Sequence, residues 1–199
     1  MFSALLVAAF KRSHSRGAGI VDHDGATIAT CFAPEENCNA VAADAVNGAE
    51  REILVNAYSL TRGSGIPEAL ARAAQRGVDV RVIADRTTPC GRNAGVDLIV
   101  RAGGSVWIDG GVRIAHAKAM VIDGKVTLVG SMNWSRGAAL NSEILNLVVS
   151  PEVAETYAAH WRQRLSASVP FTGRDQWCRL TAPPEATCED AQPSCLAGA

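Results

Sequence analysis

The sequence predicts an α/β fold in which helices flank a mixed sheet. Three short, nearly continuous apolar runs have the length and composition of strands buried on both faces, at residues 53–58, 78–84 and 144–149. Apolar residues recur at the spacing of a helix face in 37–49 and 67–76. Apolar and polar residues roughly alternate on both sides of Asp123-Gly124, which predicts a β-hairpin within 116–133.

The N-terminal half is expected to form a hairpin and then a β-α-β unit. Residues 18–32 indicate a hairpin or edge strand around the Asp24-Gly25 turn. Pro67 suits the first turn of a helix, and Gly77 ends that helix before the strand at 78–84. Two buried strands joined by one helix imply parallel pairing with a right-handed crossover.

The C-terminal half adds a polar loop, the central hairpin and a last helix. Residues 85–92 follow the strand at 78–84, and ligands usually bind at the carboxyl ends of strands in open α/β sheets. A short helix at 94–102 and a brief strand at 106–108 precede the hairpin. After the hairpin and its following strand, Pro151 opens a helix that we expect to pack back on the sheet.

The composition indicates one domain. Of the 199 residues, 48% are hydrophobic and 20% are charged, which is ordinary for a globular chain. We expect an apolar and basic segment at 1–17 that resembles a degenerate signal peptide, a domain at 18–165, and an irregular tail with Pro and Cys at 166–199. No apolar run reaches the roughly 18 residues of a membrane-spanning helix. The formal net charge is −1, so nucleic-acid binding would have to depend on a local basic patch.

The cysteines are even in number and are Cys31, Cys38, Cys90, Cys178, Cys188 and Cys195. Cys31 and Cys38 bracket a short loop that a disulfide could close. This usage slightly favours a periplasmic or secreted location. No CxxC pair or nearby histidine has the spacing of zinc ligands, so we expect no metal.

The hairpin brings polar side chains together. If Asp123 and Gly124 form a two-residue turn, Ile122 pairs with Lys125, and every second residue beyond that pair shares one face. This register places four polar residues on that face: His116, Lys118, Ser131 and Asn133. A loop of three residues would slip one strand and break the parity.

This stretch resembles the signature of the phospholipase D superfamily, HxKxxxxD followed after six residues by GSxN. Every specified position is filled, by His116, Lys118, Asp123, Gly130, Ser131 and Asn133. The wider pattern, from about Cys31 to Trp161, looks most like the small bacterial nucleases of this superfamily, which carry one copy of the motif and act as homodimers. The resemblance implies a phospholipase D-like α/β/α sandwich and no cofactor.

The resemblance also implies covalent catalysis, in which His116 attacks phosphorus and a phosphohistidine forms. Lys118, Asn133 and Ser131 would neutralise or hydrogen-bond the phosphate oxygens, so that no divalent metal is required. Many members place an acidic residue beside the histidine, and Glu143 would accept a hydrogen bond from the second nitrogen of His116. Asp123 and Gly130 of the motif are expected to be structural.

An in-line displacement needs a general acid on the side of the phosphate opposite the attacking nitrogen. The chain has three other histidines, none in an HxK context: His14, His23 and His160. His160 falls on the predicted C-terminal helix, where a surface or half-packed place is expected. A second copy of His116 is the economical donor, which predicts a homodimer sharing one active site.

Other residues are candidates for contacts with a nucleic acid. Three arginines could bind a phosphate backbone, with solvated surface as the alternative: Arg86, Arg92 and Arg136. Tyr58 and Trp134 could stack on bases or pack in the core. Cys90 lies in a loop expected near the site, where its thiol could be exposed.

These observations favour a metal-independent phosphodiesterase that hydrolyses DNA or RNA. The alternative is a phospholipase D-type hydrolase of phospholipid headgroups, which would use the same chemistry and would need an apolar surface to approach a membrane. A non-catalytic nucleic-acid-binding module is a third hypothesis. It is disfavoured because all of the reactive residues of the motif are present.

Overall fold

A mixed sheet of nine strands forms the centre of the domain, in the order β1-β2-β8-β7-β6-β3-β4-β5-β9. The computed structural model describes residues 20–23 and 25–181. Its strands are β1 Ile20–His23, β2 Ala26–Ala33, β3 Glu52–Ala57, β4 Asp79–Asp85, β5 Ser105–Asp109, β6 Lys118–Ile122, β7 Val126–Gly130, β8 Glu143–Val149 and β9 Val169–Pro170. Its helices are α2 Cys38–Asn47, α3 Ile66–Gln75, α4 Val96–Arg101, α5 Pro151–Ser166 and α6 Arg174–Thr181, with short 3-10 turns η1 Thr88–Cys90 and η2 Gly137–Leu140.

The predicted elements are confirmed. β1 and β2 form the N-terminal antiparallel hairpin, and β3 pairs in parallel with β4, with α3 as the connection between them. β5 is also parallel to β4, whereas β6, β7 and β8 pair with their neighbours in antiparallel fashion. The sheet is therefore mixed, as the sequence predicts. The predicted segment at 1–17 lies outside the described residues.

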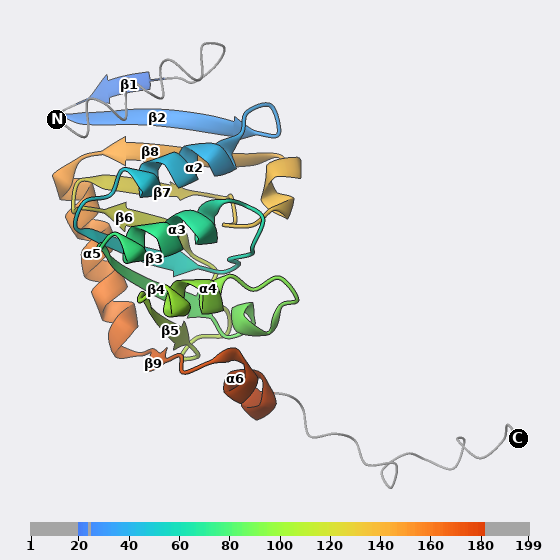
Figure 1. Cartoon of the computed structure of the whole chain (residues 1–199). Helices are drawn as coiled ribbons and strands as arrows, with labels where there is room; N and C mark the ends of the chain where they lie inside the picture. The colour runs from blue at the N-terminus through green and yellow to red at the C-terminus, as the bar shows by residue number, and fades with distance from the viewer. Residues whose placement is uncertain (1–19, 24, 182–199) are drawn as a thin grey trace, which may run out of the picture.

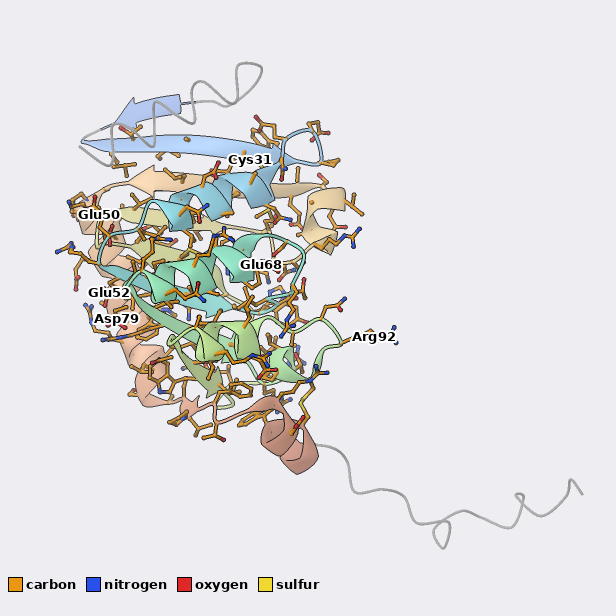
Figure 2. All side chains as sticks on the ribbon, viewed as in Figure 1. Cys31, Glu50, Glu52, Glu68, Asp79 and Arg92 are labelled. Atoms are coloured by element: carbon orange, nitrogen blue, oxygen red, sulfur yellow. A yellow bond between two sulfur atoms is a disulfide. The ribbon has the colours of Figure 1, made fainter. Side chains whose placement is uncertain are left out.

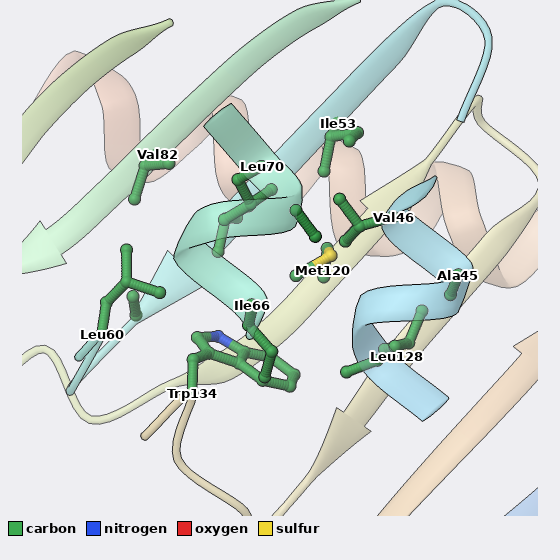
Figure 3. Close-up of a cluster of buried hydrophobic side chains, with 14 of the residues drawn as sticks. Ala45, Val46, Ile53, Leu60, Ile66, Leu70, Val82, Met120, Leu128 and Trp134 are labelled. Carbon is green, nitrogen blue, oxygen red and sulfur yellow. The ribbon is translucent and has the colours of Figure 1, made fainter. Parts of the chain in front are cut away.

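Helices cover both faces of the sheet. In Figure 1, α2, α3 and α4 lie on the near face and α5 crosses the far face. Alternate side chains of β3 point to opposite faces of the sheet. Ile53 and Val55 belong to the core under α2 and α3, whereas Leu54 belongs to a second core under α5. Figure 3 shows the first of these cores, in which Leu70 and Met120 lie between the helices and the sheet.

The helix α5 is held by a large aromatic side chain. Trp161 is 1% exposed and packs with Leu54, Ile83 and Val121. Its indole Nε1 donates a hydrogen bond of 3.0 Å to the backbone oxygen of Val55. Burial of such a side chain stabilises the domain by roughly 2–3 kcal/mol. One face of α5 is thereby fixed against the middle of the sheet.

The predicted register of the central hairpin is wrong by one residue. Ile122 pairs with Val126 instead of Lys125, so the loop contains three residues, 123–125. The Lys125 nitrogen still donates a hydrogen bond of 3.0 Å to the Ile122 oxygen, whereas the Lys125 oxygen accepts one of 3.0 Å from the Ser150 nitrogen on the β8 side, so Lys125 is an extra residue between the turn and β7. Lys118 is consequently level with Gly130, one residue from the predicted partner Val129.

The beginning of the predicted irregular tail is ordered and joins the domain. β9 pairs with β5, and Phe171 is buried in the core beneath the sheet. A disulfide joins Cys178 of α6 to Cys90 of η1, and a second disulfide joins Cys31 to Cys38 as predicted. The prediction that Cys90 could present a free thiol is therefore wrong. Cys188 and Cys195 lie outside the described residues.

Within the described ranges, the longest helix is α5, and none of the helices combines the length and apolarity that a membrane span requires.

Candidate active site

Four loops meet at one edge of the sheet. β3, β4 and β5 are parallel, and β7 runs in the same direction because two antiparallel pairings separate it from β3. Their carboxyl ends therefore lie at one edge, which carries the following loops: 58–65, 86–95, 110–117 and 131–142. His116 lies in the third loop, directly before β6, and Ser131 and Asn133 lie in the fourth.

The side chain of Lys118 contacts both the ring and the backbone of His116. Its Nζ lies 2.8 and 2.9 Å from the two ring nitrogens of His116 and donates a hydrogen bond of 2.7 Å to the His116 backbone oxygen. Near-equal distances mean that the ammonium lies along the lone pair of neither nitrogen. Lys118 is only 7% exposed, and burial lowers its pKa, while the nearby Glu143 carboxylate opposes that shift.

An aromatic ring supports the same pair. The ring centroids of Tyr58 and His116 are 4.3 Å apart at an angle of 50°, and Lys118 Nζ lies 4.8 Å from the centroid of the Tyr58 ring. Both backbone polar groups of Tyr58 are hydrogen-bonded, because its nitrogen donates to the oxygen of Ala117 and its oxygen accepts from the hydroxyl of Thr88. Tyr58 therefore belongs to the candidate site.

The loop that carries His116 is tied to the end of β4. The buried carboxylate of Asp85 accepts hydrogen bonds from the backbone nitrogen of Ala115 at 2.7 Å and from the nitrogen and hydroxyl of Thr87. Burial raises the pKa of Asp85, but these hydrogen bonds outweigh that effect and hold the pKa below its usual value. Asp85 thus fixes the residue next to His116.

Glu143 contacts a different partner from the one predicted. Its carboxylate accepts hydrogen bonds from Ser131 Oγ at 2.5 Å and from Asn141 Nδ2 at 3.2 Å. The predicted hydrogen bond is not formed between the described side chains of Glu143 and His116, whose ring nitrogens both lie near Lys118 Nζ instead. Glu143 contributes to the site as a negative charge near Lys118.

Gly130 permits the close approach of β7 and β8. A Cβ atom at this position would lie 1.9 Å from the backbone oxygen of Ile144. Immediately after it, the nitrogen of Ser131 donates to that same oxygen, and Ser131 Oγ accepts a hydrogen bond of 3.0 Å from the nitrogen of Ile144. The glycine therefore allows Ser131 to turn into the site edge beside Glu143.

Asp123 lies at the opposite edge of the sheet. Its carboxylate accepts three backbone hydrogen bonds, from Glu50 at 3.0 Å, Arg51 at 2.8 Å and Glu52 at 3.0 Å. Asp123 is 6% exposed and has a φ of 54° at the hairpin turn. It joins this turn to the start of β3, away from His116.

A cavity of about 400 Å³ opens beside His116 on the α5 side of the sheet. Its walls include Lys118, Ser131 and Asn56 together with Tyr157 and His160 of α5. An adjoining cavity of about 270 Å³ also reaches both His116 and His160. His160 is exposed, as expected for a surface position, but it faces the cavity that contains the motif histidine.

The sequence prediction did not place Asn56, Tyr157 or His160 at the site. The sequence did contain one indication of these residues. Tyr157, His160 and Arg164 are spaced so that they share one face of α5. Arg164 of this face is held by two hydrogen bonds, 2.7 and 2.8 Å long, to the buried carboxylate of Asp109, which raise its pKa. This ion pair fixes the end of α5 against β5.

The candidate arginines lie in the loops of the site edge, all with exposed side chains. The structure adds two that the sequence prediction did not single out, which makes five: Arg62, Arg86, Arg92, Arg113 and Arg136. The four loops that carry them contain no Asp or Glu. Figure 2 shows that Arg92 extends outward from this edge, whereas Glu50, Glu52 and Asp79 lie at the opposite edge. We call these five residues the basic edge.

The surroundings of Trp134 and Asn133 show how these two predicted site residues are placed. Trp134 is completely buried, and its Nε1 donates a hydrogen bond of 3.0 Å to the oxygen of Asn56, so it packs in the core. Asn133 is half-buried, and its Oδ1 has no hydrogen-bond partner in the described chain. The residues that the structure describes include no cluster of three or more His, Cys, Asp or Glu side chains arranged to hold a metal ion.

Comparison with known proteins identifies the family of the chain. A family model described as the cardiolipin synthase, PLD-like domain matches residues 43–165. The chain belongs to the phospholipase D-like family. A Rickettsia felis protein named phospholipase D is 32% identical over 142 residues, which cover 71% of this chain and 70% of that protein. The prediction of an enzyme of the phospholipase D superfamily, in the class of phosphodiester hydrolases, is confirmed.

Solved structures of the phospholipase D-like family confirm the predicted sandwich. Nuc from Salmonella typhimurium, a phospholipase D family member, is 28% identical with a TM-score of 0.68, over 73% of this chain and 98% of that chain. NucT from Helicobacter pylori is 21% identical with a TM-score of 0.67, over 73% of this chain and 99% of that chain. The second likeness concerns the fold alone.

Proposed function

We propose that the protein is a metal-independent phosphodiesterase that hydrolyses DNA or RNA through a covalent phosphohistidine intermediate. The observation that carries the choice of substrate is the basic edge. Five exposed arginines lie in the four loops around His116, and these loops contain no Asp or Glu; of the carboxylates that flank them, Asp85 and Asp109 are buried and Glu143 is bonded to Ser131, although the net charge of the whole chain is −1. Such a local patch attracts a polyanion and positions its phosphates.

The reaction would proceed in two displacements. A neutral imidazole nitrogen of His116 attacks phosphorus, the P–N bond forms, and the P–O bond to the leaving oxygen breaks as that oxygen gains a proton. Water then attacks phosphorus from the opposite side and gives a proton to the group that had protonated the leaving oxygen, while the P–N bond breaks and the imidazole is released. His116 is exposed at the cavity mouth, and both of its ring nitrogens lie within 2.9 Å of Lys118 Nζ, so the attacking nitrogen exchanges this contact for phosphorus.

Lys118, Ser131 and Asn133 would stabilise the charge on the phosphate. The ammonium of Lys118 is buried against His116 and is positioned before substrate arrives. Ser131 Oγ lies at the cavity wall, and Asn133 could donate through its amide nitrogen. Pre-positioned donors in a site with little water are typically worth about 3 kcal/mol each in the transition state.

We also propose that the enzyme acts as a homodimer, in which His116 of the partner subunit protonates the leaving oxygen. An in-line reaction requires a proton donor opposite the nucleophile. Support comes from apolar side chains exposed beside the site: Phe32 and Ile144 are neighbours on β2 and β8 and are 43% and 44% exposed, and Leu140 is 82% exposed. Full activity of a monomer in sedimentation experiments would contradict this assembly.

The alternative function is hydrolysis of a phospholipid headgroup. The Rickettsia relative named phospholipase D supports this alternative. The same His116 chemistry would apply, and the exposed Phe32, Leu140 and Ile144 could approach a lipid surface.

The deciding experiment incubates the purified protein with single- and double-stranded DNA, RNA and phospholipid vesicles in excess EDTA. We expect cleavage of nucleic acid that survives EDTA and is lost in His116→Ala. Substitution of Arg113 and Arg136 by Ala should weaken nucleic-acid cleavage and reduce its dependence on salt, because each removes a phosphate contact. Release of headgroup without cleavage of nucleic acid would replace the substrate by phospholipid.

We further propose an oxidising location, periplasmic or secreted. The disulfides Cys31–Cys38 and Cys90–Cys178 support it, since such bonds are rare in reducing compartments. Thiol titration of the protein isolated from its native host should find these four cysteines oxidised.

A further inference from the structure

The cavity beside His116 arises from the side chains of one row across three strands. On the α5 face, Leu54, Val121 and Thr127 form a row, and Trp161 packs with Leu54 and Val121 of this row. The next row toward the site consists of Asn56, Ala119 and Val129. Ala119 is small and Asn56 is short and polar, so this row does not fill the space beneath α5. The result is the cavity of about 400 Å³.

Aromatic and polar groups face one another across this space. Tyr157 and His160, one turn apart on α5, lie on one side, and Asn56 lies on the floor. The Asn56 backbone oxygen accepts from Trp134, but its side-chain amide has no hydrogen bond to any described residue, so both its donor and its acceptor are available. His116 and Ser131 line the same cavity. A group bound here would therefore adjoin the scissile phosphate.

We propose that this cavity binds the nucleobase of the nucleotide next to the scissile phosphate. The side-chain amide of Asn56 contacts the edge of the base, and Tyr157 and His160 supply surfaces on which the ring stacks. A planar heterocycle suits such a site, because an amide can donate to and accept from a base edge while aromatic side chains contact its faces. The proposal rests on the proposed nucleic-acid substrate and adds that the enzyme has a base preference.

The charges of the cavity favour a base over a cationic lipid headgroup. No Asp or Glu lines the cavity of about 400 Å³. The adjoining cavity contains Asp109, but both oxygens of that carboxylate are engaged by Arg164. A quaternary ammonium group would meet an imidazole and an amide without a counter-charge. A neutral ring with hydrogen-bonding edges meets complementary partners.

The test compares small substrates that carry a base with one that has none. One set comprises p-nitrophenyl esters of the four nucleotides, linked at the 3′ or the 5′ phosphate, and the other substrate is methyl p-nitrophenyl phosphate, which has no base. The measured quantity is the ratio of kcat/KM for each nucleotide ester to kcat/KM for the base-free ester. Variants are Asn56→Ala and His160→Ala, with Gln163→Ala on the exposed side of α5 as the matched control.

We expect the ratio to fall about 10-fold or more in Asn56→Ala and His160→Ala, mainly through KM, and to stay unchanged in Gln163→Ala. Differences among the four bases should shrink in Asn56→Ala. An unchanged ratio in both variants would overturn the subsite while leaving the nuclease proposal intact. An unchanged ratio includes the case in which a variant loses activity equally on both kinds of substrate, which would indicate a chemical or structural role of the residue. His160 is exposed, so its variant is expected to fold even if Asn56→Ala does not.

If the wild-type enzyme hydrolyses the base-free ester but favours none of the nucleotide esters over it, the base subsite is excluded. Failure to cleave any nucleic acid, with headgroup release from vesicles, identifies instead a failure of the proposed function. The two failures are therefore distinguishable.

Discussion

The Asp123→Asn substitution separates the structural part of the motif from its chemistry. The carboxylate of Asp123 accepts hydrogen bonds from the backbone nitrogens of Glu50, Arg51 and Glu52. Asparagine has nearly the same shape and tolerates the left-handed backbone conformation at φ 54°. The substitution therefore changes hydrogen bonding and charge with little change in backbone strain.

The expected loss of stability follows from the three hydrogen bonds that Asp123 accepts. Oδ1 accepts from Arg51 and Glu52, so an asparagine oxygen in that place keeps two bonds, each weakened from a charged acceptor to a neutral one by about 1 kcal/mol. The amide nitrogen then faces the Glu50 nitrogen, where two donors meet, and that lost bond costs about 2 kcal/mol. We expect the free energy of unfolding to fall by roughly 3–4 kcal/mol.

Urea denaturation monitored by tryptophan fluorescence measures this change, with Asp44→Asn on the exposed side of α2 as the control. The midpoint should fall while the slope stays constant. At a temperature where the variant is folded, kcat should remain within about 3-fold of wild type, because Asp123 lies at the edge of the sheet opposite His116. A variant of normal stability that has lost its activity would refute the reasoning.

Three further predictions concern other residues of the motif and its support. Gly130→Ala should destabilise the domain by more than about 3 kcal/mol or prevent its folding, because the new Cβ would meet the Ile144 oxygen at 1.9 Å; a thermal midpoint within a few degrees of wild type would contradict this packing. Lys118→Met should lower kcat by at least about 100-fold yet change the free energy of unfolding by less than about 1 kcal/mol, because burial already disfavours the charged form; urea titration beside steady-state kinetics measures both. Asp85→Asn should lose about 2 kcal/mol at pH 7, because the folded-state pKa of Asp85 is lowered from 3.8 and its carboxylate therefore stabilises the fold above that pH. The deficit should shrink as the pH falls below 3.8 toward the lowered folded-state pKa, and a deficit that does not decrease at all as the pH is lowered would contradict this linkage.

The sequence was sufficient to predict most of the fold because the relevant signals are local. Apolar runs, the helix-starting Pro67 and the helix-ending Gly77 each act within a few residues, and together they predict the parallel pairing of β3 with β4. The motif likewise identifies His116 and Lys118, which the structure places in direct contact.

What sequence patterns could not predict depends on long-range contacts. The hairpin register differs by one residue because Lys125 is an extra residue after the turn, and its oxygen is bonded to Ser150 of another segment instead of to β6. The pairing of Cys90 with Cys178 spans 88 residues, and six cysteines allow many pairings. His160 reaches the cavity because Trp161 fixes α5 across the sheet, which no local pattern reveals.

The central claim is that His116 forms a covalent bond to phosphorus, and the stereochemistry of hydrolysis tests it most directly. The substrate is an oligonucleotide with one phosphorothioate linkage of defined configuration, cleaved in water enriched in ¹⁸O. Two successive in-line displacements predict retention of configuration at phosphorus, and His116→Ala should give no product. Inversion would show a single direct attack by water and would contradict the phosphohistidine mechanism.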